Sequence, residues 1–212
     1  MNAPQGSAEW LYERVGKVTA SRFRDVMAKL RNGAPAKARD DYLWEVVIER
    51  ITGQPADHFT NAAMLWGIEN EMAARMSYEA RTGAMVEAAG LIPHPTLPEV
   101  AGSPDGLIGS DGGLEIKCPF NSAAHLRTVL DGMPEEHTPQ VQGLMLITGR
   151  AWWDFVSFDP RLPEDLRLYV QRIERDEGVC AALAENVAAF CAEADELMER
   201  VAESRDMPIT HR

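Results

Sequence analysis

Two carboxylates and a lysine lie close together near the middle of the chain, in an arrangement suited to phosphodiester chemistry. Asp105 lies in a turn, and Glu115 and Lys117 lie in the apolar run 114–118. Because strand side chains alternate between faces, Glu115 and Lys117 point the same way and Ile116 points into the core. A preceding hairpin strand would place Asp105 beside Glu115. The pattern therefore predicts a reactive cluster at one edge of a sheet.

The residue types in this cluster favour a hard divalent cation. Carboxylate oxygens suit Mg²⁺, with Mn²⁺ as a substitute, and the Ile116 carbonyl can face the same edge. Such an ion can activate water for attack on a phosphodiester. Lys117 could orient that water, assist its deprotonation or stabilise the developing charge, and these three roles remain open.

The spacing alone has an ordinary alternative, a turn aspartate with an exposed glutamate and lysine on an edge strand. The apolar neighbours Leu114, Ile116 and Cys118 favour a central strand instead. Glu71, within a long helical pattern, and Gln140, in the first turn of a helix after Pro139, add to the site. Each of these two residues alone is more often a solvated or locally bonded helix residue.

The elements around the cluster alternate between helices and strands. Apolar spacing predicts helices over 23–30, 42–51, 61–82, 121–130, 138–148 and from 176 onward. Apolar runs predict strands at 85–92, 114–118, 151–158 and 166–173, with a hairpin at 100–108 and a turn at 110–113. This order predicts an α/β fold with a central mixed β-sheet flanked by helices. We expect one domain over 1–212, with 1–9 as a loose arm.

Composition narrows the classes of protein that fit. The chain has 212 residues, 45% of them hydrophobic, which suffices for one sizeable core. Three widely spaced cysteines and no visible signal peptide fit a reducing cytoplasm. A four-thiolate iron–sulfur site within one chain is excluded, because it needs four cysteines. No apolar run approaches the roughly 20 residues of a membrane span, so no membrane contact is expected.

The net charge of −12 argues at first against a nucleic-acid-binding protein, but the charge is unevenly distributed. Residues 176–203 contain eight acids and one base. Residues 14–39 contain one acid and eight bases: Arg14, Lys17, Arg22, Arg24, Lys29, Arg31, Lys37 and Arg39. Counterion release depends on local cations, so this basic end could meet phosphates. The alternative is a solvated basic helix.

Four sequence blocks occur in a fixed order along the chain. They are Trp10-Leu11-Tyr12-Glu13-Arg14 with Thr19-Ala20-Ser21, Leu65-Trp66-Gly67 with Glu71, Ser103-Pro104-Asp105-Gly106-Leu107 with Leu114-Glu115-Ile116-Lys117-Cys118-Pro119-Phe120, and Gln140-Val141-Gln142. A fifth stretch covers 152–160 and 173–177. In order and spacing, these blocks resemble the phage lambda exonuclease family, the YqaJ-like viral recombinases of the PD-(D/E)xK nuclease superfamily. The resemblance implies a restriction-endonuclease-like core.

The resemblance also implies a role for each matching residue. The implied metal ligands are Asp105, Glu115 and the Ile116 carbonyl, around two Mg²⁺ ions. Lys117 would serve the attacking water, Glu71 would help to hold a metal or its water, and Gln140 would complete the catalytic set. Arg14 would bind the 5′-terminal phosphate with the hydroxyls of Thr19, Ser21 and Ser103. Met64 matches an apolar wedge that splays the terminal base pairs, although a core role is the alternative, and Arg31 matches a side chain that follows the duplex groove.

As a whole, the resemblance implies a Mg²⁺-dependent 5′→3′ exonuclease that acts on ends of double-stranded DNA and leaves a 3′ overhang for recombination by strand annealing. It further implies a ring-shaped homotrimer, a phage single-strand annealing protein as partner, and a bacterial cytoplasm as the setting. Three alternatives remain: another PD-(D/E)xK endonuclease, a non-catalytic DNA-end-binding recombination protein, and an unrelated α/β domain.

Overall fold

A five-stranded mixed sheet forms the centre of the fold. The computed structural model of the chain describes residues 3–56 and 61–204. In spatial order the strands are β2 (Val86–Glu87), β5 (Gly106–Ile108), β6 (Gly112–Lys117), β7 (Trp152–Phe158) and β8 (Leu168–Glu174). Strands β6 and β7 are parallel, and the other neighbouring pairs are antiparallel. A smaller sheet has the order β1 (Val18–Thr19), β4 (Val100–Gly102) and β3 (Ile92–Pro93).

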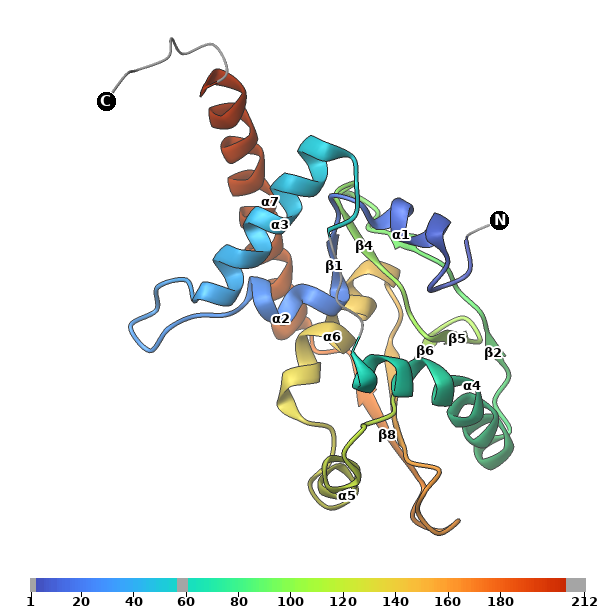
Figure 1. Cartoon of the computed structure of the whole chain (residues 1–212). Coiled ribbons are helices and arrows are strands. Elements are labelled where there is room, and N and C mark those ends of the chain that lie inside the picture. The colour runs from blue at the N-terminus through green and yellow to red at the C-terminus, as the bar shows by residue number, and fades with distance from the viewer. Residues whose placement is uncertain (1–2, 57–60, 205–212) are drawn as a thin grey trace.

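Helices cover both faces of the larger sheet (Figure 1). Side chains of β7 alternate: Trp153 and Phe155 enter one apolar cluster, and Val156 and Phe158 enter another. The first cluster is closed by α2 (Phe23–Val26), α3 (Lys37–Thr52), α6 (Thr138–Thr148) and α7 (Glu177–Ser204). The second is closed by α4 (Ala62–Thr82). The remaining helices are α1 (Ala8–Arg14), η1 (Ala20–Arg22), α5 (Ser122–Asp131) and η2 (Glu135–His137). The predicted flanking of a mixed sheet by helices is confirmed.

Two glycines at the start of β6 leave room for the indole rings of the paired residues on β7. A Cβ on Gly112 would lie 2.1 Å from the Trp152 ring, and one on Gly113 would lie 2.3 Å from the Trp153 ring. Any other residue would displace these rings. The turn predicted over 110–113 is shorter than expected, because Gly112 and Gly113 already belong to β6 and pair with Trp152 and Trp153 of β7.

Several predicted element boundaries are wrong. The strand predicted at 85–92 is split into β2 and β3, which belong to different sheets. The predicted loose arm already contains the start of α1, which Ser7 caps by accepting from the Trp10 amide; its first two residues lie outside the described ranges. Helix α2 ends at Val26, because 29–35 forms a turn closed by a bridge between Lys29 and Pro35. Helix α3 starts at Lys37 rather than at 42. No helix in the described ranges has the length and apolarity needed to cross a membrane.

Candidate active site

The hairpin of β5 and β6 brings the predicted carboxylates and lysine together. Gly106 pairs with Leu114, which puts Asp105 opposite Glu115. Asp105 Oδ2 accepts a hydrogen bond from the Ile116 amide at 2.6 Å. Lys117 Nζ donates to Glu115 Oε1 at 2.6 Å. The predicted placement of Asp105 beside Glu115, with Lys117 on the same side, is confirmed.

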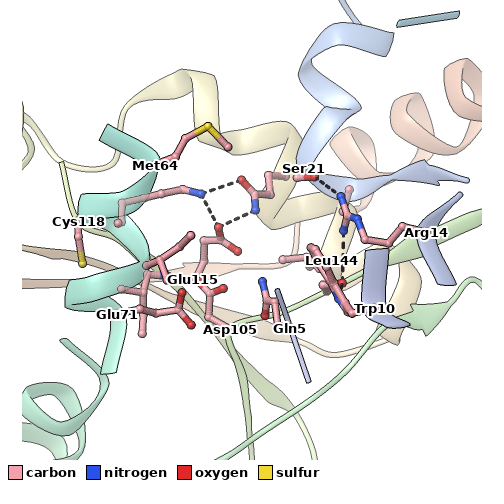
Figure 2. Close-up of a pocket in the computed structure, with 17 residues that line it drawn as sticks. Gln5, Trp10, Arg14, Ser21, Met64, Glu71, Asp105, Glu115, Cys118 and Leu144 are labelled. Carbon is pink, nitrogen blue, oxygen red and sulfur yellow. Dashed lines mark hydrogen bonds and ion pairs between the residues drawn. The ribbon is translucent and has the colours of Figure 1, made fainter. Parts of the chain in front are cut away.

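Two helices bring further polar groups to the same place. Gln140, near the start of α6, donates from Nε2 to Glu115 Oε1 at 2.6 Å and accepts from Lys117 Nζ at 3.1 Å. Figure 2 shows, as dashed lines, the hydrogen bonds that meet at Glu115. Glu71, on α4, is half-buried and lines the same cavity as Asp105. The structure therefore gathers all five predicted catalytic side chains around one cavity.

Burial and a neighbouring negative charge raise the pKa values of Asp105 and Glu71. Burial, followed by the charge of Glu115, raises the pKa of Asp105 well above its usual range. The same two causes raise the pKa of Glu71. Burial alone would lower the pKa of Lys117, but Glu115 and Asp105 outweigh it, and the net pKa is raised. The neighbouring carboxylates therefore favour the protonated form of Lys117.

The oxygens of this site fit a hard divalent cation. Glu115 is 2% exposed, and its Oε2 is buried with no hydrogen-bond partner. A buried carboxylate oxygen without a partner is costly, and a coordinated cation would satisfy it. In the described ranges, no three acidic, histidine or cysteine side chains are already gathered as a metal-binding group. A metal held by Asp105 and Glu115 would therefore also take oxygens from water, phosphate or the Ile116 carbonyl.

A second polar cluster surrounds Arg14 at the end of α1. The Arg14 guanidinium donates to Ser103 Oγ at 3.4 Å, Thr19 Oγ1 at 3.2 Å and Ser21 Oγ at 3.4 Å. It also lies 4.3 Å from the centroid of the Trp10 ring, and Trp10 Nε1 donates to Ser103 Oγ at 3.0 Å. Burial lowers the pKa of Arg14. Within the described part of the chain, no carboxylate pairs with this guanidinium.

One cavity of about 520 Å³ joins the two clusters. Figure 2 shows Arg14 and Ser21 at one end and Glu71, Asp105 and Glu115 at the other. The cavity lining also contains Met64, which is 46% exposed on α4 and so does not lie in the core.

Seven further residues that line this cavity had no predicted role. They are Gln5, Trp10, Ala20, Gly67, Ile68, Cys118 and Leu144. The spacing of Trp10 and Arg14, four residues apart on one helix, is a signal that would have identified the stacked pair. No comparable signal marks Gln5, which precedes α1.

The predicted basic end is only partly available to a ligand. Four of its eight cations are in ion pairs: Arg22 with Asp25 and Glu45, Arg24 with Glu136, Lys37 with Asp41, and Arg39 with Glu193. Arg31 is exposed in the turn before α3 and is not among the residues that line the cavity. The structure thus brings Arg14 to the site and does not bring Arg31 there.

Comparisons with known proteins place this geometry in context. The model of the YqaJ-like viral recombinase domain family matches residues 9–151. An alkaline exonuclease from Laribacter hongkongensis, LHK-Exo, is 43% identical with a TM-score of 0.87, covering 94% of this chain and 98% of the other. A structure of LHK-Exo in complex with dAMP matches equally well. A phage-related exonuclease from Haemophilus somnus 129PT is 17% identical with a TM-score of 0.67, covering 87% and 96%, and shows a shared fold. A search of curated proteins finds no match.

Proposed function

We propose, from the premise that this chain belongs to the YqaJ-like viral recombinase domain family, that it digests one strand of double-stranded DNA from a 5′-phosphorylated end. The chain has the PD-(D/E)xK nuclease fold and is a deoxyribonuclease. The 5′→3′ direction, the dependence on Mg²⁺ and the 3′ overhang are our proposal. One observation carries it: the cavity that holds Asp105, Glu115 and Lys117 also holds the guanidinium of Arg14, without a carboxylate partner in the described residues.

Arg14 explains how a DNA end would be chosen. A terminal phosphate carries more negative charge than an internal diester, and a guanidinium binds phosphate through two parallel hydrogen bonds. The present partners of Arg14 are neutral hydroxyls, which can turn to donate to the phosphate. A closed circular duplex has no such terminal group.

The carboxylate cluster explains how the adjacent phosphodiester would be cut. Asp105, Glu115 and the Ile116 carbonyl would hold Mg²⁺, which, when bound, supplies charge stabilisation and an activated water. Lys117 Nζ is held by Glu115 and Gln140, from where it would orient the attacking water, assist its deprotonation or stabilise the developing charge. Glu71 would hold a second ion or a water of the first.

The relative with dAMP supports the proposed product. LHK-Exo is named an alkaline exonuclease, and its structure with dAMP holds a nucleoside monophosphate. Successive removal of mononucleotides from a 5′ end would leave the 3′ overhang used in strand annealing. Family membership likewise motivates a ring-shaped homotrimer, a phage single-strand annealing protein as partner, and a phage or prophage origin in bacterial cytoplasm.

The decisive experiment uses linear duplex DNA with a labelled phosphate at one 5′ end. We expect labelled mononucleotide to appear first, in Mg²⁺ and not in EDTA. Lys117→Ala should abolish it, whereas Arg127→Ala, which changes an exposed arginine on α5, should leave it unchanged. Equal cutting of circular DNA would instead indicate an endonuclease. Bound but intact ends would indicate a non-catalytic end-binding protein.

A further inference from the structure

The helix that carries Glu71 is attached to the rest of the fold on both sides of that residue. Towards its C-terminus, Tyr78 donates to Oδ2 of the buried Asp154 on β7 at 2.6 Å. Towards its N-terminus, the Trp66 ring lies against the guanidinium of Arg161, with 4.3 Å between the guanidinium carbon and the ring centroid. Glu71 thus lies on α4 between a hydrogen-bonded attachment and a cation–π attachment.

The orientation of Arg161 is itself fixed by Asp159, which directly follows β7 and is fully buried. Arg161 donates from Nε to Asp159 Oδ1 at 2.7 Å and from Nη2 to Oδ2 at 2.8 Å. Nη2 also donates to the Pro119 carbonyl at 3.3 Å. A two-pronged pair of this kind defines the plane of the guanidinium. One flat face of Arg161 is therefore held ready for the Trp66 ring.

Trp66 depends on ring contacts for its position. Its Nε1 is buried and has no hydrogen-bond partner in the described structure. Besides Arg161, the ring meets Phe120 edge-on, with centroids 6.2 Å apart and planes at 84°. Pro119 and Phe120 follow Lys117 closely in the chain, just beyond β6. Arg161 thus contacts three parts of the fold: Asp159 directly after β7, Pro119 directly after β6, and Trp66 on α4.

We infer that Arg161 is a positioning residue that, through Trp66, sets the distance between Glu71 and the carboxylates of Asp105 and Glu115. We call the group of Asp159, Arg161 and Trp66 the Arg161 latch. The inference rests on the proposed function, since it concerns the affinity of the same site for a divalent cation. Negative charges on Glu71, Asp105 and Glu115 repel one another, so the position of α4 relative to the sheet affects how these groups share a cation. Trp66 and Glu71 are five residues apart, about 7.5 Å along a stiff helix, so displacement of one moves the other.

The two possible roles of Arg161, as a nearby positive charge or as a support for α4, predict opposite effects of Arg161→Ala on the affinity for a cation. If Arg161 acted only as a nearby positive charge, Arg161→Ala would strengthen binding of a cation. If it acts by holding α4, Arg161→Ala weakens binding, by about the 2- to 5-fold that a cation–π contact is worth. Arg161→Lys keeps the charge but loses the flat guanidinium, so it should weaken binding in the same direction.

The test is calorimetric titration of the full chain with Mn²⁺ in the absence of DNA. The variants are Arg161→Ala, Arg161→Lys, Glu71→Ala and the double variant Glu71→Ala/Arg161→Ala, with Arg127→Ala, an exposed arginine on α5, as matched control. We expect a 2- to 5-fold higher Kd for Arg161→Ala and no change for Arg127→Ala. In the Glu71→Ala background, Arg161→Ala should raise Kd no further, because the two residues act through one position.

Other results would overturn the latch. An unchanged or lower Kd for Arg161→Ala would do so, and so would an equal increase with and without Glu71. If the wild-type chain binds Mn²⁺ and degrades DNA in either case, the proposed function survives and the latch alone fails. If the wild-type chain neither binds Mn²⁺ nor degrades DNA, both fail. Thermal unfolding of each variant without metal identifies any that does not fold.

Discussion

In the proposed function, recognition of a DNA end depends on Arg14. Arg14→Ala should reduce the preference for a 5′-phosphate over a 5′-hydroxyl by about 10- to 100-fold, the value of a charged hydrogen-bonded contact. Arg14→Lys should recover only part of it, because an ammonium does not form the two-pronged contact. The measurement is the initial rate on matched 5′-phosphate and 5′-hydroxyl duplexes. An equal loss on both substrates would contradict a pocket specific for the terminal phosphate.

Asp105 is the residue at which the proposed site would trade stability for function. Its folded pKa is raised above that of an unfolded aspartate, so the folded state binds the proton more tightly. Stability in the absence of metal therefore falls as pH rises from the unfolded pKa through the folded one, and the penalty persists above both values. We expect Asp105→Asn to raise the unfolding temperature in EDTA at pH 8 and to abolish activity. The rise should be roughly 2–4 °C for each kcal/mol gained in the free energy of unfolding.

The Asp105→Asn variant also tests whether the ionised carboxylate stabilises or destabilises the fold in the absence of metal. Asparagine can still accept the Ile116 amide hydrogen bond, so that contact is retained. Mg²⁺ should then stabilise the wild-type chain more than the variant. A lower unfolding temperature for the variant in EDTA would show that the ionised carboxylate is not under strain. Glu115→Gln is less suitable, because Glu115 accepts from both Lys117 and Gln140.

Two helical glycines have contrasting surroundings and form a matched pair. A Cβ at Gly143, on α6, would lie 2.4 Å from the Phe23 ring, whereas one at Gly67, on α4, would meet nothing within 4 Å. Gly143→Ala should destabilise the fold by about 1–3 kcal/mol through overpacking. Gly67→Ala should stabilise it by up to about 1 kcal/mol through helix propensity. Chemical denaturation measures both, and a shift of the same sign in both would refute the packing argument.

At the level of elements, the sequence predicts the β5–β6 hairpin more accurately than it predicts the short strands and the short helix around it. The alternation in 114–118 is enough to place Glu115 and Lys117 on one side of a strand, because side-chain direction in a strand is a local property. The split of 85–92 between two sheets depends on partners far along the chain, which local pattern does not contain. The contact between Arg161 and Trp66 joins residues 95 positions apart and has no sequence signature. Helix α1 is too short for periodicity to reveal.

Across the whole molecule, the acidic C-terminal helix serves partly to neutralise the basic N-terminal region. Arg39 pairs with Glu193 at 2.8 Å, and Arg50 pairs with Asp195 at 2.7 Å, which ties α3 to α7 (Figure 1). A chain with net charge −12 repels DNA at a distance. Attraction is then concentrated where a cation lacks an acidic partner and at a bound metal. Among the described residues, Arg14 in the cavity is such a cation, and so are the exposed Lys29 and Arg31, so the cavity and the turn over 29–35 are both places where DNA would be attracted.

The proposed homotrimer needs an apolar surface, and α3 provides one. Trp44, Ile48 and Ile51 are 41%, 53% and 38% exposed and lie along one stripe of the helix. Sedimentation equilibrium of the wild-type chain should give about three times the 23.5 kDa of one chain. Trp44→Glu/Ile48→Glu should shift the mass towards a single chain, because burying two carboxylates in an interface is costly.

A matched control tests whether a charge placed at any exposed apolar residue would change the mass, or only a charge placed in the α3 stripe. Leu130, on α5, is 82% exposed and stands apart from the α3 stripe, so Leu130→Glu should leave the mass unchanged. If the α3 double variant remains a trimer, another surface forms the ring. If the wild-type chain has the mass of a single chain, the ring is wrong, and sustained digestion of one DNA molecule must depend on Arg14 holding the new 5′-phosphate after each cut.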